Sequence, residues 1–175
     1  MRNILIIGAG KSASYLVKYF LDKSSSENLE ITIGDLEISK AKKWIGNHPN
    51  AKALKLDIFD KAARQAAVTN ADIVISMLPA RFHIEVAKDC LAFGKHMVTA
   101  SYVSDEMKAL DAEAKAKNLI FLNEIGLDPG VDHMSAMQII DRITESGGKM
   151  ILFESFTGGL MAPESDNNLW NYKFT

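Results

Sequence analysis

The feature that most constrains the fold lies near the start of the chain, where a short apolar run meets a glycine-rich turn. Residues 4–7 (ILII) are apolar on both faces of a strand, as expected for a central parallel strand covered by helices on each side. The run stops at Gly8, and residues 8–13 (GAGKSA) fit the pattern G-x-G-x-x-G/A. Apolar residues at helical spacing follow directly, including Leu16 and Phe20. This order of strand, glycine turn and helix predicts a dinucleotide site.

Each small residue of the turn has its own physical role. Gly8 allows a tight turn out of the strand, Gly10 lets the backbone approach a pyrophosphate, and Ala13 leaves room for the helix to pack on the strand. Lys11 and Ser12 lie at the helix N-terminus, where free N–H groups and the helix dipole favour an anion. The alternative interpretation is a glycine turn that serves only strand–helix packing.

Asp35 follows the expected second strand, residues 29–33 (LEITI), and predicts which cofactor is bound. An acidic residue here accepts hydrogen bonds from the adenosine ribose hydroxyls. At about 4 Å, a carboxylate and a 2′-phosphate repel by about 4 kcal/mol per unit charge at an effective dielectric near 20. No arginine occurs between Asp35 and Arg64 to bind such a phosphate. We therefore expect NAD rather than NADP, the alternative being a simple turn aspartate.

The rest of the first 122 residues alternates between strand-sized and helix-sized segments. Further strands are expected at residues 51–56, 72–79, 96–100 and 119–122, and helices at 39–47, 60–69, 82–93 and 104–117. Six strands and five helices in alternation predict an α/β fold with a doubly wound parallel sheet, the Rossmann architecture. Asp57 ends the third strand and serves either the cofactor or a turn. Met77, Leu78 and Pro79 end the fourth strand at the ligand-binding crevice of such sheets.

Composition and charge exclude several classes of protein. The formal net charge of −2 gives no basic surplus for nucleic acid or an anionic membrane surface, and no apolar run is long enough to span a bilayer. Cys90 is the only cysteine, so no internal disulfide can form, and we expect a packed thiol and a cytoplasmic setting. His83 and His96 have no partner at metal-ligand spacing, so both are interpreted as structural and no metal is expected.

A second polar stretch, residues 123–133, follows the last expected strand. Pro129 suits the first turn of a helix, and Asp128 suits its N-cap. Alternatively, the Asp128 carboxylate faces the nicotinamide end of the crevice and binds a cationic group of a substrate.

Three segments resemble saccharopine dehydrogenase of the glutamate-forming type. They are residues 101–104 (SYVS), 123–137 (NEIGLDPGVDHMSAM) and 158–174 (GGLMAPESDNNLWNYKF). The resemblance implies a Rossmann domain over residues 1–125, and residues 126–175 would begin an α+β substrate and dimerisation domain that the chain contains only in part. It also implies a homodimer for the full-length protein.

The resemblance assigns roles residue by residue. The expected pyrophosphate and ribose contacts are Gly8, Gly10, Lys11, Ser12, Ala13 and Asp35. The expected adenine and nicotinamide contacts are Asp57, Ile58, Met77, Leu78, Pro79, Leu127 and Pro129. The expected substrate contacts are Ser101, Tyr102, Asp128, Thr157 and Phe174, with Thr157 standing where the family often has cysteine. His133 is interpreted as structural.

The implied activity is that of an NAD(P)-dependent oxidoreductase acting on the CH–NH bond of saccharopine, an amino-acid substrate of lysine metabolism. Hydride leaves the carbon beside the amine, and hydrolysis of the imine gives glutamate and 2-aminoadipate semialdehyde. Asp128 and Tyr102 are the expected catalytic residues. For this enzyme, inactivity of the 175-residue chain by itself is compatible with the expectation that it contains only part of the substrate domain. Two alternatives remain: a dehydrogenase that forms carboxynorspermidine, and a regulatory module that binds NAD without catalysis.

Overall fold

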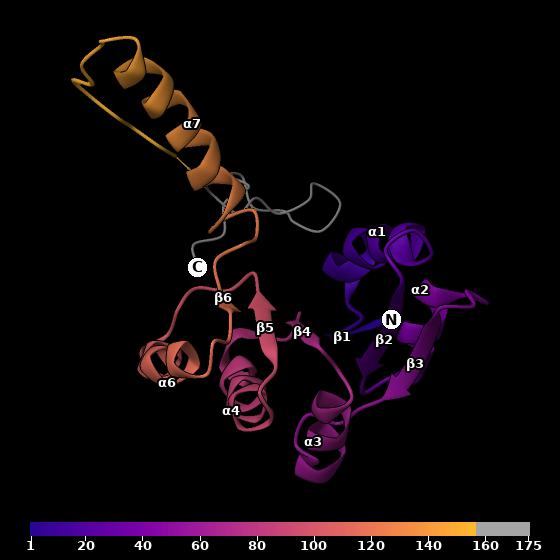
Figure 1. Cartoon of the computed structure of the whole chain (residues 1–175). Coiled ribbons are helices and arrows are strands. Elements are labelled where there is room, and N and C mark those ends of the chain that lie inside the picture. The colour runs from indigo at the N-terminus through magenta and orange to yellow at the C-terminus, as the bar shows by residue number, and fades with distance from the viewer. Residues whose placement is uncertain (157–175) are drawn as a thin grey trace, which may run out of the picture. The chain divides into compact units, whose positions relative to one another are not determined.

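A computed structural model describes residues 1–156 of the chain. The chain divides into two compact units, Met1–Ser135 and Ala136–Thr175. The first unit contains every strand of the described residues and is shown in indigo to orange in Figure 1. The helix α7 (Val131–Glu145) crosses the boundary between the units.

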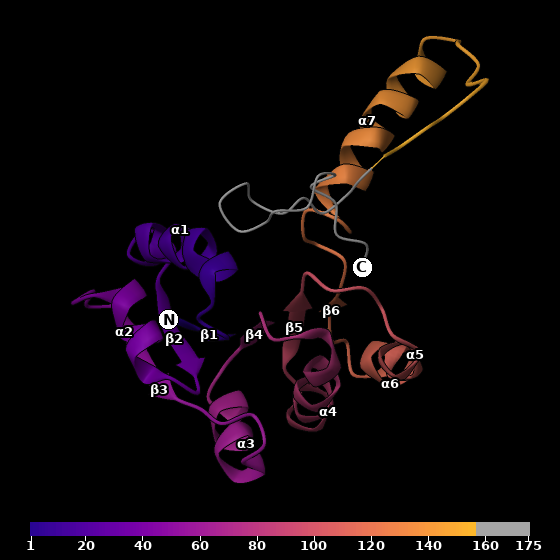
Figure 2. The ribbon, with the colours of Figure 1, turned by 180° about the vertical axis from the view of Figure 1, so that it is seen from behind.

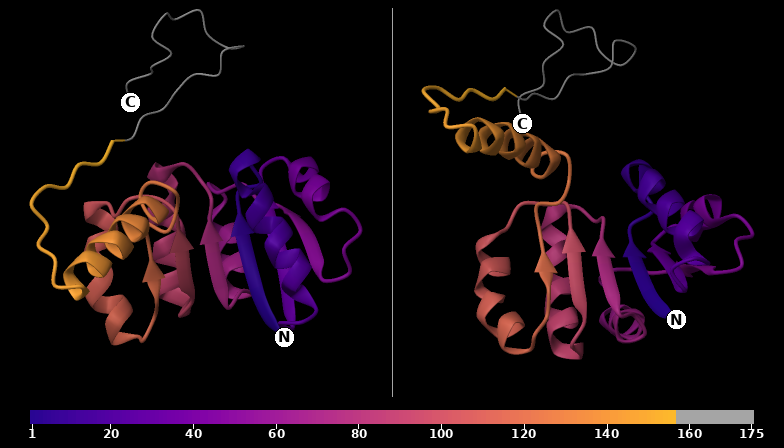
Figure 3. Two further views of the ribbon diagram at one scale, coloured as in Figure 1. Left: turned by 90° about the horizontal axis from the view of Figure 1, so that it is seen from above. Right: turned by 45° about the horizontal axis from the view of Figure 1, so that its top comes forward.

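The first unit is built on one six-stranded parallel sheet in the order β3-β2-β1-β4-β5-β6. The strands are β1 (Arg2–Ile7), β2 (Leu29–Asp35), β3 (Ala51–Lys55), β4 (Ile73–Ser76), β5 (His96–Thr99) and β6 (Phe121–Leu122). Their arrows all point the same way in Figure 3. The strand order reverses between β1 and β4, so the carboxyl ends of these two strands border the crevice in which such sheets bind ligands. The predicted doubly wound parallel sheet is confirmed.

Helices cover both faces of the sheet, as Figures 1 and 2 show. The helices α1 (Ser14–Ser24) and α2 (Ile38–Ile45) lie on one face. On the other face lie α3 (Lys61–Thr69), α4 (His83–Phe93), α5 (Asp105–Ala109) and α6 (Asp111–Ala116). Short 3₁₀ turns, Lys11–Ala13 and Ala80–Phe82, precede α1 and α4. None of the helices within residues 1–156 has the length and apolar character needed to cross a membrane.

The core consists of two apolar clusters that share β1. Ile4 and Ile6 pack with residues of α1 and α2 on one face, and Leu5 and Ile7 pack with residues of α3 and α4 on the other. All four side chains are at most 5% exposed. The run that is apolar on both faces is therefore the central strand it was predicted to be.

The single helix predicted over residues 104–117 is wrong, because the segment forms two short helices. Leu110 has φ −83° and ψ −11° and separates α5 from α6, and its N–H donates to the carbonyl of Met107. This tighter turn lets Met107 and Ala114 both be buried. The predicted cap is confirmed, because the Met107 N–H donates to Ser104 Oγ at 3.2 Å. Strands β4 and β6 are shorter than predicted, and Met77 to Pro79 follow β4 as a loop.

Candidate active site

The glycine turn after β1 has the geometry that only glycine allows at its first position. Gly8 has φ +106°, and a Cβ there would lie 2.8 Å from the carbonyl oxygen of Met77. Gly10 is different, since a Cβ at that position would meet nothing within 4 Å. Ala13 is fully buried beneath the turn. The backbone at Gly10 is therefore open to a ligand, whereas Gly8 is required by the protein itself.

The N–H groups of this turn fall into two sets. Gly8 donates to the carbonyl of Gly34 at 2.8 Å, and Ala9 donates to Asp35 Oδ2 at 2.8 Å. Within residues 1–156, the N–H groups of Gly10, Lys11 and Ser12 donate no hydrogen bond. These three amides begin the 3₁₀ turn that runs into α1, so they form the part of the loop that can hold a phosphate.

Asp35 has a second role that its sequence position did not reveal. Its Oδ2 accepts the Ala9 N–H, and its Oδ1 accepts the Glu37 N–H at 2.9 Å. The indole Nε1 of Trp44 donates to the carbonyl of Ala9 at 3.0 Å. The end of β2 and the helix α2 therefore fix the glycine turn from two directions. Each carboxylate oxygen keeps a further lone pair for a ribose hydroxyl, but the two N–H dipoles offset part of the Asp35 charge.

The loop after β3 is shaped by a turn and by a buried arginine. Asp57 Oδ1 accepts the Phe59 N–H at 2.9 Å, which is the turn role weighed for it from the sequence. The carbonyl of Ile58 accepts from Nη1 of Arg64 at 2.5 Å, and Arg64 also donates to Asp89 at 2.5 Å. Arg64 was not singled out from the sequence. The signal available was its position four residues before Val68, which places both on the buried face of α3, and Arg64 is 5% exposed.

Four polar side chains meet at the carboxyl ends of β4 and β5. His83 is 4% exposed, and its Nδ1 lies 2.8 Å from Ser76 Oγ. Its Nε2 lies 2.7 Å from Ser101 Oγ and 3.2 Å from Thr99 Oγ1. Burial lowers the pKa of His83. The structural interpretation of His83 is confirmed, as is that of His96, whose Nδ1 accepts the Ile120 N–H at 3.0 Å.

Tyr102 and Asp128, which are 26 residues apart, are joined by a hydrogen bond. The Tyr102 hydroxyl donates to Asp128 Oδ1 at 2.9 Å. This bond to Asp128 raises the pKa of Tyr102. The predicted N-cap role of Asp128 is wrong, because α7 begins only at Val131 and the Gly130 N–H donates to Asp132 Oδ1 instead. The Asp128 carboxylate is therefore free of the helix and available for other contacts.

The residues around Asp128 add two further features. Leu127 is 77% exposed and Pro129 is buried. Although no metal cluster was expected from the sequence, Asp128, Asp132 and His133 bring possible ligand atoms within 4.8 Å of one another, an arrangement that is common without a metal. His133 Nδ1 contacts Asp132 Oδ1 at 2.8 Å, and this contact raises the pKa of His133.

A pocket of about 350 Å³ lies beside Tyr102. Its polar and charged lining residues are Arg81, His83, Tyr102, Ser104, Glu106 and Asn123. Among residues 1–156, the Oδ1 atom of Asn123 is buried and has no hydrogen-bond partner. A pocket with both charge signs and an unpaired carbonyl suits a polar ligand group.

Comparison with known proteins supplies the family. A family model described as the saccharopine dehydrogenase NADP binding domain matches residues 4–122, and one described as the saccharopine dehydrogenase C-terminal domain matches residues 126–175. The chain belongs to the saccharopine dehydrogenase family. The resemblance seen in the sequence motifs is thereby confirmed.

Two curated relatives match nearly the whole chain. Saccharopine dehydrogenase [NADP(+), L-glutamate-forming] of Schizosaccharomyces pombe is 41% identical over 100% of this chain and 38% of its own length. The alpha-aminoadipic semialdehyde synthase of Arabidopsis thaliana is 36% identical over 98% of this chain and 18% of its own length. The chain therefore spans about two fifths of the length of the curated saccharopine dehydrogenases that it matches.

Solved structures support the same family and the same fold. The apo saccharopine dehydrogenase (L-Glu forming) of Saccharomyces cerevisiae superposes with a TM-score of 0.82 at 32% identity, over 100% of this chain and 38% of that one. The 3-ketoreductase KijD10 of Actinomadura kijaniata superposes with a TM-score of 0.62 at 18% identity, covering 82% of this chain and 44% of that one, which shows the fold alone.

Two points of the family comparison bear on the predicted site. The family model and the relatives are described with NADP, against the preference for NAD drawn from Asp35. NAD and NADP are both nicotinamide dinucleotides, so the prediction and the family comparison agree on that class of cofactor. Thr157 and Phe174, predicted as substrate contacts, lie outside the described residues.

Proposed function

We propose that the chain carries the cofactor site and part of the substrate site of an NADP-dependent saccharopine dehydrogenase that forms glutamate. The observation that carries the proposal is the Tyr102–Asp128 hydrogen bond of 2.9 Å, which pairs two residues from separate family motifs. Both belong to the same compact unit as the glycine turn with its open amides at Gly10, Lys11 and Ser12.

The proposed reaction oxidises a carbon–nitrogen bond. When bound, the nicotinamide accepts a hydride from the carbon beside the secondary amine of saccharopine. The cationic amine first loses one of its two protons to water; the hydride then carries away both electrons of the C–H bond, and a protonated C=N bond forms. Water adds to this imine, and the C–N bond breaks to give 2-aminoadipate semialdehyde and the amino group of glutamate.

Asp128 and Tyr102 would bind and orient the amine. A secondary amine is cationic at neutral pH, so it favours a site beside a carboxylate. Tyr102 donates to Oδ1 of Asp128, which leaves Oδ2 of the same carboxylate to accept an N–H from the substrate. The raised pKa of Tyr102 keeps its hydroxyl protonated at neutral pH. Tyr102 therefore acts as a hydrogen-bond donor and not as a base.

NADP is the proposed cofactor. Its support is the NADP in the description of the family model and in the names of the relatives. The local electrostatics are compatible with a 2′-phosphate, because Asp35 already accepts two backbone N–H groups. Lys40 adds a cation, and its pKa is raised by its hydrogen bond to Glu37 and also by the Asp35 charge. The repulsion calculated above for an isolated carboxylate is therefore an upper bound on the repulsion between Asp35 and a 2′-phosphate.

Calorimetric titration tests the cofactor proposal, with NADP and NAD compared on the same chain and on its Asp35→Asn variant. We expect tighter binding of NADP, and a further shift toward NADP when the Asp35 charge is removed. Tighter binding of NAD by ten-fold or more would show that Asp35 excludes the phosphate, and the NADP proposal would be wrong.

The reaction itself is tested by the absorbance of reduced cofactor at 340 nm, with saccharopine and carboxynorspermidine as competing substrates for the full-length protein. We expect turnover with saccharopine and a large loss of kcat/KM in Asp128→Asn. Turnover with carboxynorspermidine alone would contradict the substrate assignment. Binding of cofactor without turnover of either compound would favour a regulatory module.

A further inference from the structure

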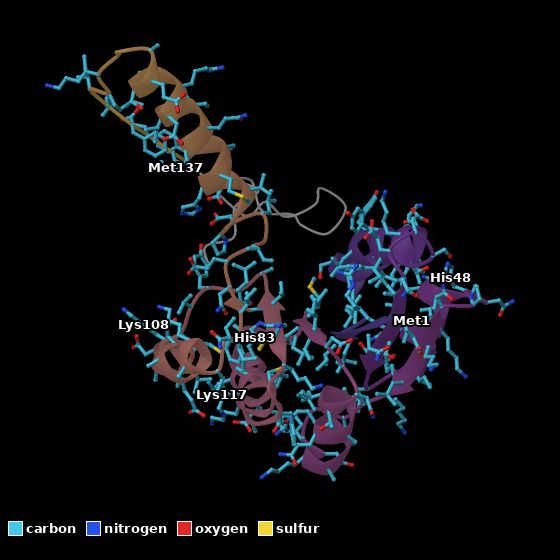
Figure 4. All side chains as sticks on the ribbon, in the orientation of Figure 1. Met1, His48, His83, Lys108, Lys117 and Met137 are labelled. Carbon is cyan, nitrogen blue, oxygen red and sulfur yellow. The ribbon has the colours of Figure 1, made fainter. Side chains whose placement is uncertain are left out.

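His83 contacts three hydroxyl groups, yet the proposed chemistry gives it no role. It is the first residue of α4 (Figure 4), and its buried ring contacts side chains at the carboxyl ends of β4 and β5. Ser76 ends β4, Thr99 ends β5, and Ser101 lies two residues beyond β5. The ring therefore joins a buried strand end to the residue that the family resemblance makes a substrate contact.

The protonation state of the ring limits what it can do. Burial lowers the pKa of His83, so the ring is neutral near pH 7 and has one N–H donor and one nitrogen lone pair. One ring nitrogen must donate and the other must accept. The geometry then decides which nitrogen carries the proton.

Two hydroxyl oxygens face Nε2, whereas one faces Nδ1. Ser101 Oγ and Thr99 Oγ1 lie 2.7 and 3.2 Å from Nε2, and Ser76 Oγ lies 2.8 Å from Nδ1. A single N–H can be shared by two acceptors, but one lone pair in the ring plane cannot serve two hydroxyl donors equally well. The arrangement therefore favours the tautomer in which Nε2–H donates to Ser101 and Nδ1 accepts from Ser76.

We propose that His83 is a positioning residue that holds the Ser101 hydroxyl oxygen as an acceptor and so turns the Ser101 proton toward the substrate. The Ser101 oxygen is held by Nε2–H, and the backbone N–H of Ser101 is held by Thr99 Oγ1 at 3.3 Å. With both groups fixed, the hydroxyl proton is left for an acceptor in the crevice. Saccharopine carries carboxylate groups that can accept it.

The inference rests on the proposed function, because it takes Ser101 as a contact of saccharopine. It goes beyond that function by assigning a task to His83, which acts on the substrate through Ser101. Without the ring, the Ser101 hydroxyl would distribute over three staggered rotamers, so orientation alone accounts for about a three-fold effect on affinity.

The test compares two substitutions of His83 with a matched histidine. His83→Phe fills the space without polar atoms, and His83→Gln keeps one donor and one acceptor. His96→Gln is the control, because His96 is also a structural histidine with a single backbone partner, but it starts β5 and so lies at the opposite end of that strand from Ser101. Saccharopine affinity is measured by calorimetry at saturating NADP, and NADP affinity is measured separately.

We expect His83→Phe to weaken saccharopine binding by about three-fold or more with NADP affinity unchanged, since three rotamers become accessible. His83→Gln should restore most of the loss, and His96→Gln should bind saccharopine as the unsubstituted protein does. If Ser101→Ala weakens saccharopine binding while His83→Phe does not, the positioning role is overturned.

If the chain binds no saccharopine, that result counts against the proposed function. A second measurement still tests the role of His83 in that case. Nitrogen-15 chemical shifts of the His83 ring report which nitrogen carries the proton. We expect a proton on Nε2 and a change in its shift in Ser101→Ala. A proton on Nδ1, or a ring signal that is the same in Ser101→Ala, would overturn the inference.

Discussion

Replacing Arg64 with methionine tests how far a buried ion pair between α3 and α4 stabilises the fold. Arg64 Nε donates to Asp89 Oδ2 at 2.5 Å, and the two side chains are only 6% and 5% exposed. Nη1 donates to the carbonyl of Ile58. In Arg64→Met, the Asp89 carboxylate keeps only the amide of Gln65, at 2.9 Å, as a hydrogen-bond partner among the described side chains. An unpaired charge would then remain between α3 and α4.

The expected destabilisation is about 3–5 kcal/mol, the range for removing one partner of a buried pair. This is a large part of the roughly 5–15 kcal/mol that stabilises a typical domain. With a urea m-value of about 2 kcal/mol/M, the unfolding midpoint should fall by about 2 M. The double variant Arg64→Met with Asp89→Leu removes both charges, so it should recover most of this loss.

Urea unfolding followed by circular dichroism measures the stability of Arg64→Met, of the single variant Asp89→Leu and of the double variant. Lys18→Met is the control, because it breaks the exposed Lys18–Asp22 pair, whose side chains are 70% and 61% exposed. Exposed pairs contribute little net stability, so the control midpoint should barely move. If Arg64→Met were no worse than the control, or if the double variant lost the sum of both single losses, the pair would not hold the two helices together as argued.

Three further predictions concern other parts of the first unit. Gly8→Ala should lower the free energy of unfolding by about 1–3 kcal/mol and abolish cofactor binding in a calorimetric titration, because its φ is +106° and a Cβ would lie 2.8 Å from the Met77 carbonyl oxygen. Unchanged binding would contradict that packing. The Cys90 thiol is buried, and burial raises its pKa to about 12, so a thiol reagent at pH 8 should label it only as urea unfolds the protein; rapid labelling of the folded protein would refute this. The thermal midpoint should fall as the pH is lowered below about 6.5, because unfolded His83 binds a proton that the folded state resists, and His83→Gln should flatten this dependence. A slope that is the same in His83→Gln would assign the effect to another group.

Local sequence signals were enough to predict the sheet and the glycine turn. The aliphatic residues 4–7 are continuous, which fits a strand buried on both faces, and the glycine pattern follows within one turn. Ser104 likewise capped its helix as predicted, because a cap depends on the three residues after it.

The features that were missed depend on contacts between distant parts of the chain. Asp128 suited a helix cap by its local sequence, but its partner is Tyr102 from the loop after β5. Three other contacts join segments that pack together only after the sheet has formed. They are the hydrogen bond from Ala9 to Asp35, the buried pair of Arg64 and Asp89, and the contacts of His83. Secondary-structure propensity and residue spacing are local properties of the sequence, so they do not predict contacts between distant residues.

The central claim is that the open amides of the glycine turn bind the diphosphate of a nicotinamide dinucleotide. Titration of the nitrogen-15-labelled chain with NADP, followed by amide proton–nitrogen spectra, tests it most directly. We predict the largest changes in amide chemical shift at Gly10, Lys11 and Ser12. The change at Ala9 should be smaller, because its N–H already donates to Asp35. Saturable shifts elsewhere with no change at these three amides would contradict the account.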